Sequence, residues 1–173
     1  SKSCLFNVDK ATGLLEQATQ RPSPNCDARP DEADPSMIVV HGISLPPGEF
    51  GGPEIEALFM NQLDWDAHPY FQQIRGLEVS AHLLIRRDGS VLQFVPFTQR
   101  AWHAGDSCFR GRRRCNDFSI GIELEGEDNT ASDDRQYQVL QGVIRELRAA
   151  YPAISPREVA GHCDIAPGRK IDT

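Results

Sequence analysis

The last dozen residues of the chain combine side chains that can bind a metal ion and stabilise negative charge. Residues 161–172 read Gly-His-Cys-Asp-Ile-Ala-Pro-Gly-Arg-Lys-Ile-Asp, so they contain His162, Lys170 and Asp172. An imidazole and a carboxylate are zinc ligands, and a neighbouring lysine can stabilise an oxyanion. A catalytic zinc takes three protein ligands and keeps one position open. This segment supplies two, so a third ligand must come from elsewhere.

The third candidate ligand is His41, which ends the apolar run of residues 37–40. Such a run is typical of a strand that is buried on both faces. A histidine where a strand ends suits a site at the edge of an α/β sheet. We therefore hypothesise that His41, His162 and Asp172 bind one zinc ion.

Two further charged groups would complete a hydrolytic site. Glu123 would transfer the proton of an attacking water whose pKa the metal lowers. Lys170 lies two residues before Asp172, so in an extended segment both side chains point the same way. The Lys170 ammonium would then stabilise the oxyanion formed on an amide carbonyl. These roles predict metal-dependent amide hydrolysis.

Two other chemistries are consistent with the same segments. Residues 118–125 alternate apolar and polar, which places Glu123 and Glu125 on one strand face about 7 Å apart. That separation suits an inverting glycosidase without a metal. Cys163 beside His162 suggests thiol chemistry, but adjacent side chains point apart and a catalytic dyad is normally assembled by the fold.

Two segments contain candidates for substrate binding. Trp102 and His103 lie in an aromatic and glycine-containing segment that suits a ligand-binding wall, although Trp102 would suit the core equally well. Residues 106–117 contain four arginines, which would either bind substrate carboxylates or face solvent. The candidate substrate-binding residues are Trp102, His103, Arg114 and Asn116.

Length and composition narrow the class of protein. The 173 residues suit one domain with a proper core, and a net charge of −7 argues against nucleic acid or an anionic membrane as partner. No apolar run reaches the length of about 18 residues that a membrane helix needs. The five cysteines are irregularly spaced, which favours a reduced, cytoplasmic setting. We expect a monomer that acts on a small diffusible substrate.

The elements that must position these residues form an α/β pattern. Helices are predicted from Pro53, from Pro69 and over residues 133–150, the last with a buried stripe of Tyr137, Leu140, Ile144 and Leu147. Strands are predicted at residues 37–41, 79–85, 90–95, 118–125 and 158–161. Asp88-Gly89 predicts a hairpin between the second and third of these. The expected fold is α/β or α+β, a single mixed sheet flanked by helices.

Loops are predicted where proline and glycine gather. Residues 21–36 contain four prolines and should form an extended loop. Residues 44–52 would form a lid, a pocket wall or a plain surface connection. His68, just before the helix at Pro69, is expected to be structural.

Four motifs resemble those of a known family, in order and with matching spacing. Residues 40–48 read VHGISLPPG, residues 101–105 AWHAG, residues 115–126 CNDFSIGIELEG, and residues 161–167 GHCDIAP. Through these motifs the chain from about residue 20 onward resembles the AmpD-type cytoplasmic amidases. These are zinc N-acetylmuramoyl-L-alanine amidases specific for 1,6-anhydro-muramyl peptides.

The resemblance implies the fold shared by phage lysozyme-type amidases and peptidoglycan recognition proteins. It also implies zinc on His41, His162 and Asp172, with Glu123 as catalytic carboxylate and Lys170 as active-site lysine. The implied reaction cleaves a muropeptide between its lactyl group and L-alanine during cell-wall recycling, with a link to β-lactamase induction. A peptidoglycan-fragment receptor that does not cleave is the alternative.

Several positions depart from the family pattern. Gly42 stands where asparagine is common, and Glu78 where some members have arginine. Ala81 stands where phage relatives have a tyrosine, which leaves proton transfer to Glu123. The family continues beyond the position of Thr173. We therefore expect residues 1–173 to be one amidase domain, with residues 1–20 as an arm and a C-terminal tail missing.

Overall fold

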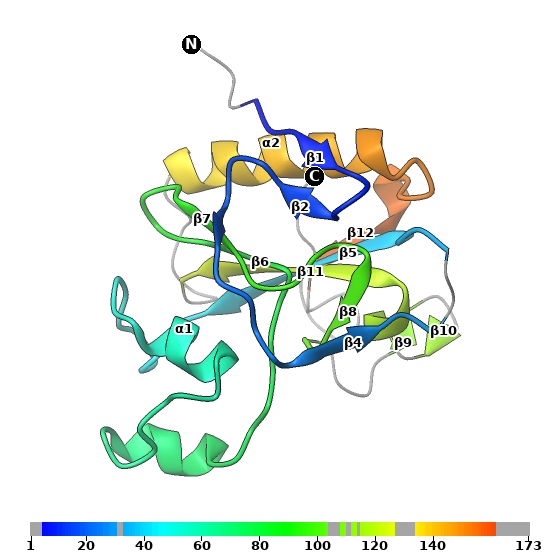
Figure 1. Ribbon diagram of the computed structural model, residues 1–173. Helices are drawn as coiled ribbons and strands as arrows, with labels where there is room; N and C mark the ends of the chain where they lie inside the picture. The colour runs from blue at the N-terminus through cyan, green and yellow to red at the C-terminus, as the bar shows by residue number, and fades with distance from the viewer. Residues whose placement is uncertain are drawn as a thin grey trace.

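A mixed six-stranded sheet forms the centre of the computed structural model (Figure 1). The structure describes residues 5–30, 33–103, 108–109, 112–113, 115–126 and 134–161. The strand order is β12-β5-β11-β6-β7-β3. These strands are β3 (Thr19–Gln20), β5 (Met37–Ile43), β6 (Leu83–Ile85), β7 (Val91–Gln93), β11 (Ser119–Glu125) and β12 (Val159–Gly161). The expected single mixed sheet with flanking helices is confirmed.

The two long central strands are parallel and in full register. β5 and β11 pair from Met37 opposite Ser119 to Ile43 opposite Glu125. Every residue of β5 from Met37 to His41 is buried, as the apolar sequence predicted. The register places Glu123 directly beside His41.

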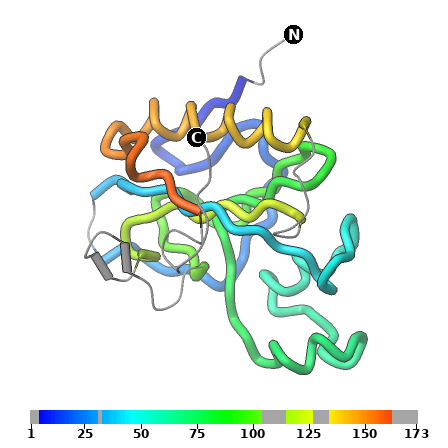
Figure 2. Tube along the Cα trace, turned by 180° about the vertical axis from the view of Figure 1, so that it is seen from behind, coloured from blue at the N-terminus to red at the C-terminus, as the bar shows by residue number. Residues whose placement is uncertain are grey.

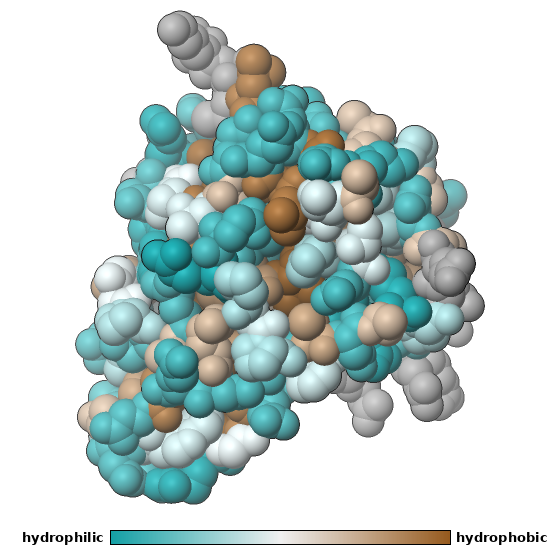
Figure 3. Space-filling view, viewed as in Figure 1, coloured by the Kyte–Doolittle hydropathy of each residue, from teal (hydrophilic) through white to brown (hydrophobic). Residues whose placement is uncertain are grey.

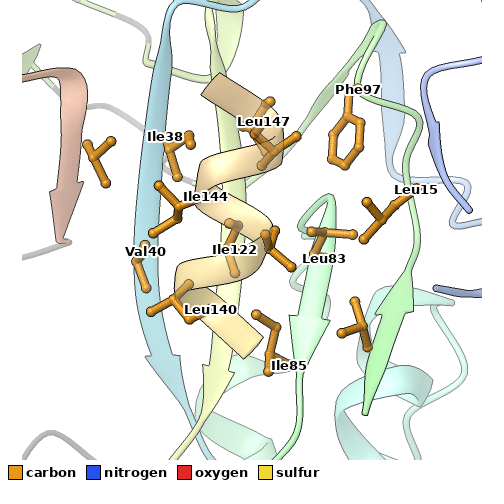
Figure 4. Close-up of a cluster of buried hydrophobic side chains, with 14 of the residues drawn as sticks. Leu15, Ile38, Val40, Leu83, Ile85, Phe97, Ile122, Leu140, Ile144 and Leu147 are labelled. Atoms are coloured by element: carbon orange, nitrogen blue, oxygen red, sulfur yellow. The ribbon is translucent and has the colours of Figure 1, made fainter. Parts of the chain in front are cut away.

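One face of the sheet is covered by α2 (Asp134–Ala150). Figure 4 shows Leu140, Ile144 and Leu147 of α2 directed at sheet residues that include Ile38 and Ile122. This helix agrees with the prediction for residues 133–150. Within the described part of the chain, neither α-helix has the length and apolar character that a membrane crossing requires.

The buried stripe of α2 differs from the prediction at Tyr137, which is 43% exposed. Gln136 is buried instead, and its side-chain amide donates 3.0 Å hydrogen bonds to the carbonyl oxygens of Ile85 and Glu125. These two bonds fix the first turns of the helix against the strand ends. They turn Tyr137 outward, which the apolar spacing alone could not reveal.

The opposite face carries a second apolar cluster beneath α1 (Glu54–Phe59) and the 3₁₀ helix η1 (Pro69–Ile74). Figures 1 and 2 show that this segment projects from the sheet on the side away from α2. The predicted helix at Pro53 is confirmed, with Ile55, Leu58 and Phe59 buried. His68 caps η1 by accepting a hydrogen bond from the backbone N–H of Tyr70, so its structural role is confirmed.

The hairpin predicted at Asp88-Gly89 joins β6 to β7, with Gly89 at a φ of +89°. The strand before it is shorter than predicted. Ser80 donates its N–H to the carbonyl of Trp102, and His82 donates its N–H to Gly121. Residues 79–82 therefore form hydrogen bonds to several different segments. Only residues 83–85 pair regularly with the neighbouring strands β7 and β11.

The N-terminal part of the chain contains short strands where the sequence predicted an extended loop. β4 (Cys26–Ala28) lies within residues 21–36 and pairs with β8 (Gln99–Ala101). Its partner is more than 70 residues away, so local patterning could not indicate the strand. The remaining elements are β1 (Val8–Asp9), β2 (Leu14–Leu15), β9 (Cys108–Phe109), β10 (Arg112–Arg113), η2 (Cys115–Asp117) and η3 (Pro156–Glu158).

The centre of the fold contains a neutral histidine, His82, which is fully buried. Its Nε2 lies 2.8 Å from the carbonyl oxygen of Gln99, and its Nδ1 accepts the N–H of Gly121 at 3.0 Å. Burial and then the nearby positive charge of Arg29 lower the pKa of His82 to about 3. Protonation would add a second charge and displace the Gly121 N–H.

This histidine should make the metal-free protein sensitive to acid. The folded pKa of about 3 lies below the unfolded value near 6.5, so the stabilisation is complete above pH 6.5 and is lost as pH falls. Over that window we expect a loss of about 1.4 kcal/mol per pH unit from this group. Urea unfolding at several pH values should show a flatter slope for His82→Asn.

The matched control is His68→Asn, which leaves His82 in place and should keep the wild-type slope. An His82→Asn protein with the wild-type slope would show that acid unfolding has another origin.

Candidate active site

Glu123 and His41 lie side by side on β11 and β5 and form the polar centre of the candidate site. Their exposed fractions are 9% and 7%. Paired residues of neighbouring parallel strands direct their side chains to the same face of the sheet. The two groups that sequence reasoning assigned to proton transfer and metal binding are therefore neighbours.

The Glu123 carboxyl is buried without a full set of partners. Its Oε2 has no hydrogen-bond partner within the described residues. Burial alone raises the pKa of Glu123 to about 8. A carboxyl with a pKa near neutrality, at the edge of a pocket, is suited to accept and return a proton.

His103 lies next to His41 and lines the same pocket as Glu123. Its Nδ1 is 3.0 Å from Nε2 of His41, and its Nε2 is 3.0 Å from Oγ of Ser119. Its backbone N–H donates to Oδ1 of Asn116 at 3.1 Å. Asn116, a predicted substrate-binding residue, thus also orients His103.

Trp102 is held at the exit of β8 by a charged cluster. Its indole N–H donates to Asp27 at 3.3 Å, and Arg100 donates two hydrogen bonds to Asp27, at 2.7 and 2.6 Å. Arg100 also pairs with Asp117 at 2.6 Å. The hydrogen bonds from Arg100 are the main reason that the pKa of Asp27 is lowered. Trp102 is half-buried, so it remains a candidate wall for a ligand.

A pocket of about 310 Å³ opens beside these residues. Glu123, His103 and Ser80 contribute polar atoms, and side chains from the end of β5, from α1 and from η1 and the residues after it contribute an apolar wall. The apolar lining residues are Ile43, Leu45, Leu58, Phe59, Tyr70, Ile74, Leu77 and Val79. Ser44 and Leu45 also line it, so the start of the segment 44–52 is a pocket wall, one of the roles predicted for it. Gly42, a departure from the family pattern, lies on the same wall.

Glu125 lies two residues from Glu123 but has a different environment. It is 2% exposed and pairs with Arg86 at 2.9 Å. It also accepts the backbone N–H groups of Gly51 at 2.6 Å and Arg87 at 3.1 Å. These contacts occupy the carboxylate and anchor the segment 44–52 to the sheet. The geometry argues against Glu125 as the second acid of a glycosidase.

Glu125→Gln should therefore destabilise the fold. The change removes the charge that Arg86 and two backbone N–H groups contact, although Arg86 keeps its pair with Glu56 at 3.1 Å. The expected loss is about 1–3 kcal/mol in the free energy of unfolding. Urea denaturation monitored by circular dichroism measures this change. The control is Asp66→Asn, which breaks the exposed Asp66–Arg75 pair and should cost less than about 1 kcal/mol. Equal losses in both variants would contradict the anchoring role.

The remaining predicted site residues, His162, Lys170, Asp172 and Arg114, lie outside the described residues, as does Cys163. Within the described residues there is accordingly no group of three metal-binding side chains. β12 runs parallel to β5 and pairs Gly161 with Val40. Gly161, the last described residue, thus lies beside the residue that precedes His41 on β5.

Three contributors to the site were missed by sequence reasoning. Ser119 and Gly121 contact His103, and Arg86 holds Glu125. Ser119 and Gly121 lie on the same face of β11 as Glu123, whereas Ile120 and Ile122 lie on the other face. The period-two pattern could therefore have identified Ser119 and Gly121. No local signal marks Arg86, whose partners come from distant segments.

Figure 3 shows that the face seen in Figure 1 is mostly hydrophilic, with hydrophobic residues exposed mainly in a narrow central strip. Together, the mixed sheet, the paired His41 and Glu123 and the adjoining pocket define an α/β domain with a candidate hydrolytic site on its central strands. The chain belongs to the N-acetylmuramoyl-L-alanine amidase family, whose family model matches residues 31–173.

Individual relatives agree with this assignment. The 1,6-anhydro-N-acetylmuramyl-L-alanine amidase AmpD of Salmonella typhimurium (strain SL1344) is 61% identical over 160 residues, which cover 92% of this chain and 85% of that protein. A crystal structure of a selenomethionine AmpD derivative has a TM-score of 0.89 at 59% identity, covering 95% of this chain and 90% of that one.

A more distant solved structure contains a bound substrate. It is a complex of the Escherichia coli N-acetylmuramyl-L-alanine amidase AmiD with anhydro-N-acetylmuramic acid-L-Ala-D-γ-Glu-L-Lys. Its TM-score is 0.54 at 26% identity, and the match covers 96% of this chain and 60% of that one.

Proposed function

We propose that this protein hydrolyses the amide bond between the lactyl group of 1,6-anhydro-N-acetylmuramic acid and L-alanine in muropeptides, as part of peptidoglycan recycling. Relatives that are 49–61% identical over most of the chain carry this activity in their names. The structural observation that carries the proposal is the buried Glu123 beside His41 at the edge of a pocket.

The proposed cofactor is one zinc ion bound by His41, His162 and Asp172. The described residues fit a cation in two respects. A buried imidazole lies near the end of β5, and the adjacent Glu123 has an Oε2 with no partner within the described residues. The parallel pairing of Gly161 with Val40 supports delivery of the next residue to the level of His41. When bound, zinc supplies Lewis acidity to the amide carbonyl and to the attacking water.

The protein's own groups then move protons and orient the substrate. Glu123 accepts a proton from the attacking water while the water oxygen forms a bond to the lactyl carbonyl carbon. Lys170 stabilises the oxyanion, and Glu123 returns the proton to the L-alanine nitrogen as the C–N bond breaks. The pocket orients the substrate, with Trp102 against it and Arg114 near the peptide carboxylates.

We also propose a cytoplasmic monomer. The half-buried Cys26 is a free thiol, which is consistent with a reducing compartment. The acidic net charge of −7 is consistent with a small substrate rather than a polyanionic partner.

The test is to incubate the purified protein with 1,6-anhydro-N-acetylmuramyl tripeptide and separate the products by chromatography. Free tripeptide and anhydro-sugar should appear, a chelator should abolish the reaction, and added zinc should restore it. Full activity after complete zinc removal would overturn the mechanism. Substrate binding by calorimetry without turnover would support a receptor instead, and release of sugar from a glycosidic bond would support a glycosidase.

A further inference from the structure

His103 is fixed in position by contacts on three sides. Its Nδ1 faces His41, its Nε2 faces Ser119, and its backbone N–H bonds to Asn116. The rings of His41 and His103 meet edge to face, with centroids 5.2 Å apart and an interplanar angle of 69°. Ser119 is fully buried. Such a set of contacts positions a ring rather than leaving it to follow a ligand.

The backbone of β11 is shaped to admit this ring. A Cβ atom at Gly121 would lie 2.4 Å from Cγ of His103 and 2.5 Å from its Cδ2. Real side chains do not approach so closely, so a side chain at position 121 would displace the imidazole. Glycine is therefore required here by the close approach of the His103 ring.

If His41 binds the metal, the contacts allow one pattern of protons. Metal-binding histidines donate the N–H of their other ring nitrogen to a neighbouring acceptor, which fixes the tautomer and the ring orientation. With His41 Nε2 as donor, His103 accepts at Nδ1 and donates from Nε2 to Ser119 Oγ. The metal-binding atom of His41 is then Nδ1.

We infer that His103 is a positioning residue for His41, held in turn by Ser119, and is not primarily a wall for the substrate. This inference rests on the proposed function, in which His41 is a metal ligand. It assigns to a second histidine the part that a carboxylate or a backbone carbonyl usually takes beside a metal-bound imidazole.

The experiment measures metal affinity in the full chain. Zinc dissociation constants are obtained by competition with a chromophoric chelator, and the cobalt-substituted protein gives an absorption spectrum of the coordination sphere. His103→Ala should weaken zinc binding by about 10–100-fold while one ion still binds per chain. His103→Asn should bind zinc nearly as tightly as the wild type and keep its cobalt spectrum, because Oδ1 of asparagine can accept the His41 N–H.

Two outcomes would overturn the inference. Unchanged zinc affinity in His103→Ala would show that His103 does not act through His41. Loss of the metal to the level of His41→Ala, with no rescue by asparagine, would make His103 a ligand. Stoichiometry and the asparagine rescue decide between the two, because two nitrogens that share a tetrahedral zinc lie about 3.3 Å apart, close to the 3.0 Å between His41 Nε2 and His103 Nδ1.

Two further variants break the same contacts without altering either histidine. Gly121→Ala displaces the His103 ring, and Ser119→Ala removes its second partner, so both should weaken zinc binding. His68→Ala is the control for loss of a histidine. Thermal unfolding of each metal-free variant shows whether the fold is retained. A wild-type protein that binds no zinc would disprove the proposed function itself, which separates that failure from the failure of this inference.

Discussion

Glu123→Gln should lower kcat by about 10²–10⁴-fold while one zinc ion remains bound. Glutamine keeps the size of the side chain but cannot accept a proton from water or return it to the leaving nitrogen. The carboxyl is buried on β11 and is not a proposed ligand, so the metal site should survive its replacement. Steady-state kinetics with the anhydro-muramyl tripeptide and metal analysis of the same sample measure both quantities.

The matched control is Glu16→Gln, which changes an exposed glutamate that does not line the pocket. It should retain wild-type kcat and zinc content. If Glu123→Gln turned over substrate at the wild-type rate, another group would have to carry the proton. If it lost its zinc, the position would belong to the coordination sphere.

His41→Ala should lose the metal itself and reduce amidase activity to the level of the chelator-treated wild type. It removes one of three proposed ligands, and the remaining two are too few for a catalytic zinc site. Atomic absorption of the purified variant should find no stoichiometric zinc. His68→Ala provides the comparison, because His68 caps η1 and should leave zinc content unchanged.

The two histidine variants separate the proposed site from a general effect of losing an imidazole. Full zinc content in His41→Ala would exclude His41 as a ligand. Equal loss in both variants would indicate that the metal is bound only through the integrity of the fold.

The parts of the fold that follow local periodicity were predictable from the sequence. β5, β11, α2 and the Asp88-Gly89 hairpin all follow apolar patterns or turn chemistry. β4 and Tyr137 were not predictable, because each depends on partners far away in the chain. The same division holds for the candidate site: the strand patterns predicted the strands that place His41 beside Glu123, but no pattern indicated that Ser119 contacts His103.

Glu123 and Glu125 show why pattern alone cannot assign chemistry. Both lie on one face of one strand, so the sequence treats them alike. In the structure, Arg86 and two backbone N–H groups occupy Glu125, whereas Oε2 of Glu123 has no partner within the described residues. The difference comes from Arg86 and from the segment 44–52, which only the folded chain brings to Glu125.

The position of β5 between β11 and β12 has a consequence for biosynthesis. β5 ends at Ile43, but β11 begins only at Ser119 and β12 at Val159. A ribosome adds about 5–20 residues per second, so both edges of this apolar strand stay unpaired for roughly ten seconds during synthesis. Unpaired edges of that kind promote association between nascent chains. Additional chaperone during synthesis should therefore raise the recovered yield more than any substitution within the catalytic centre.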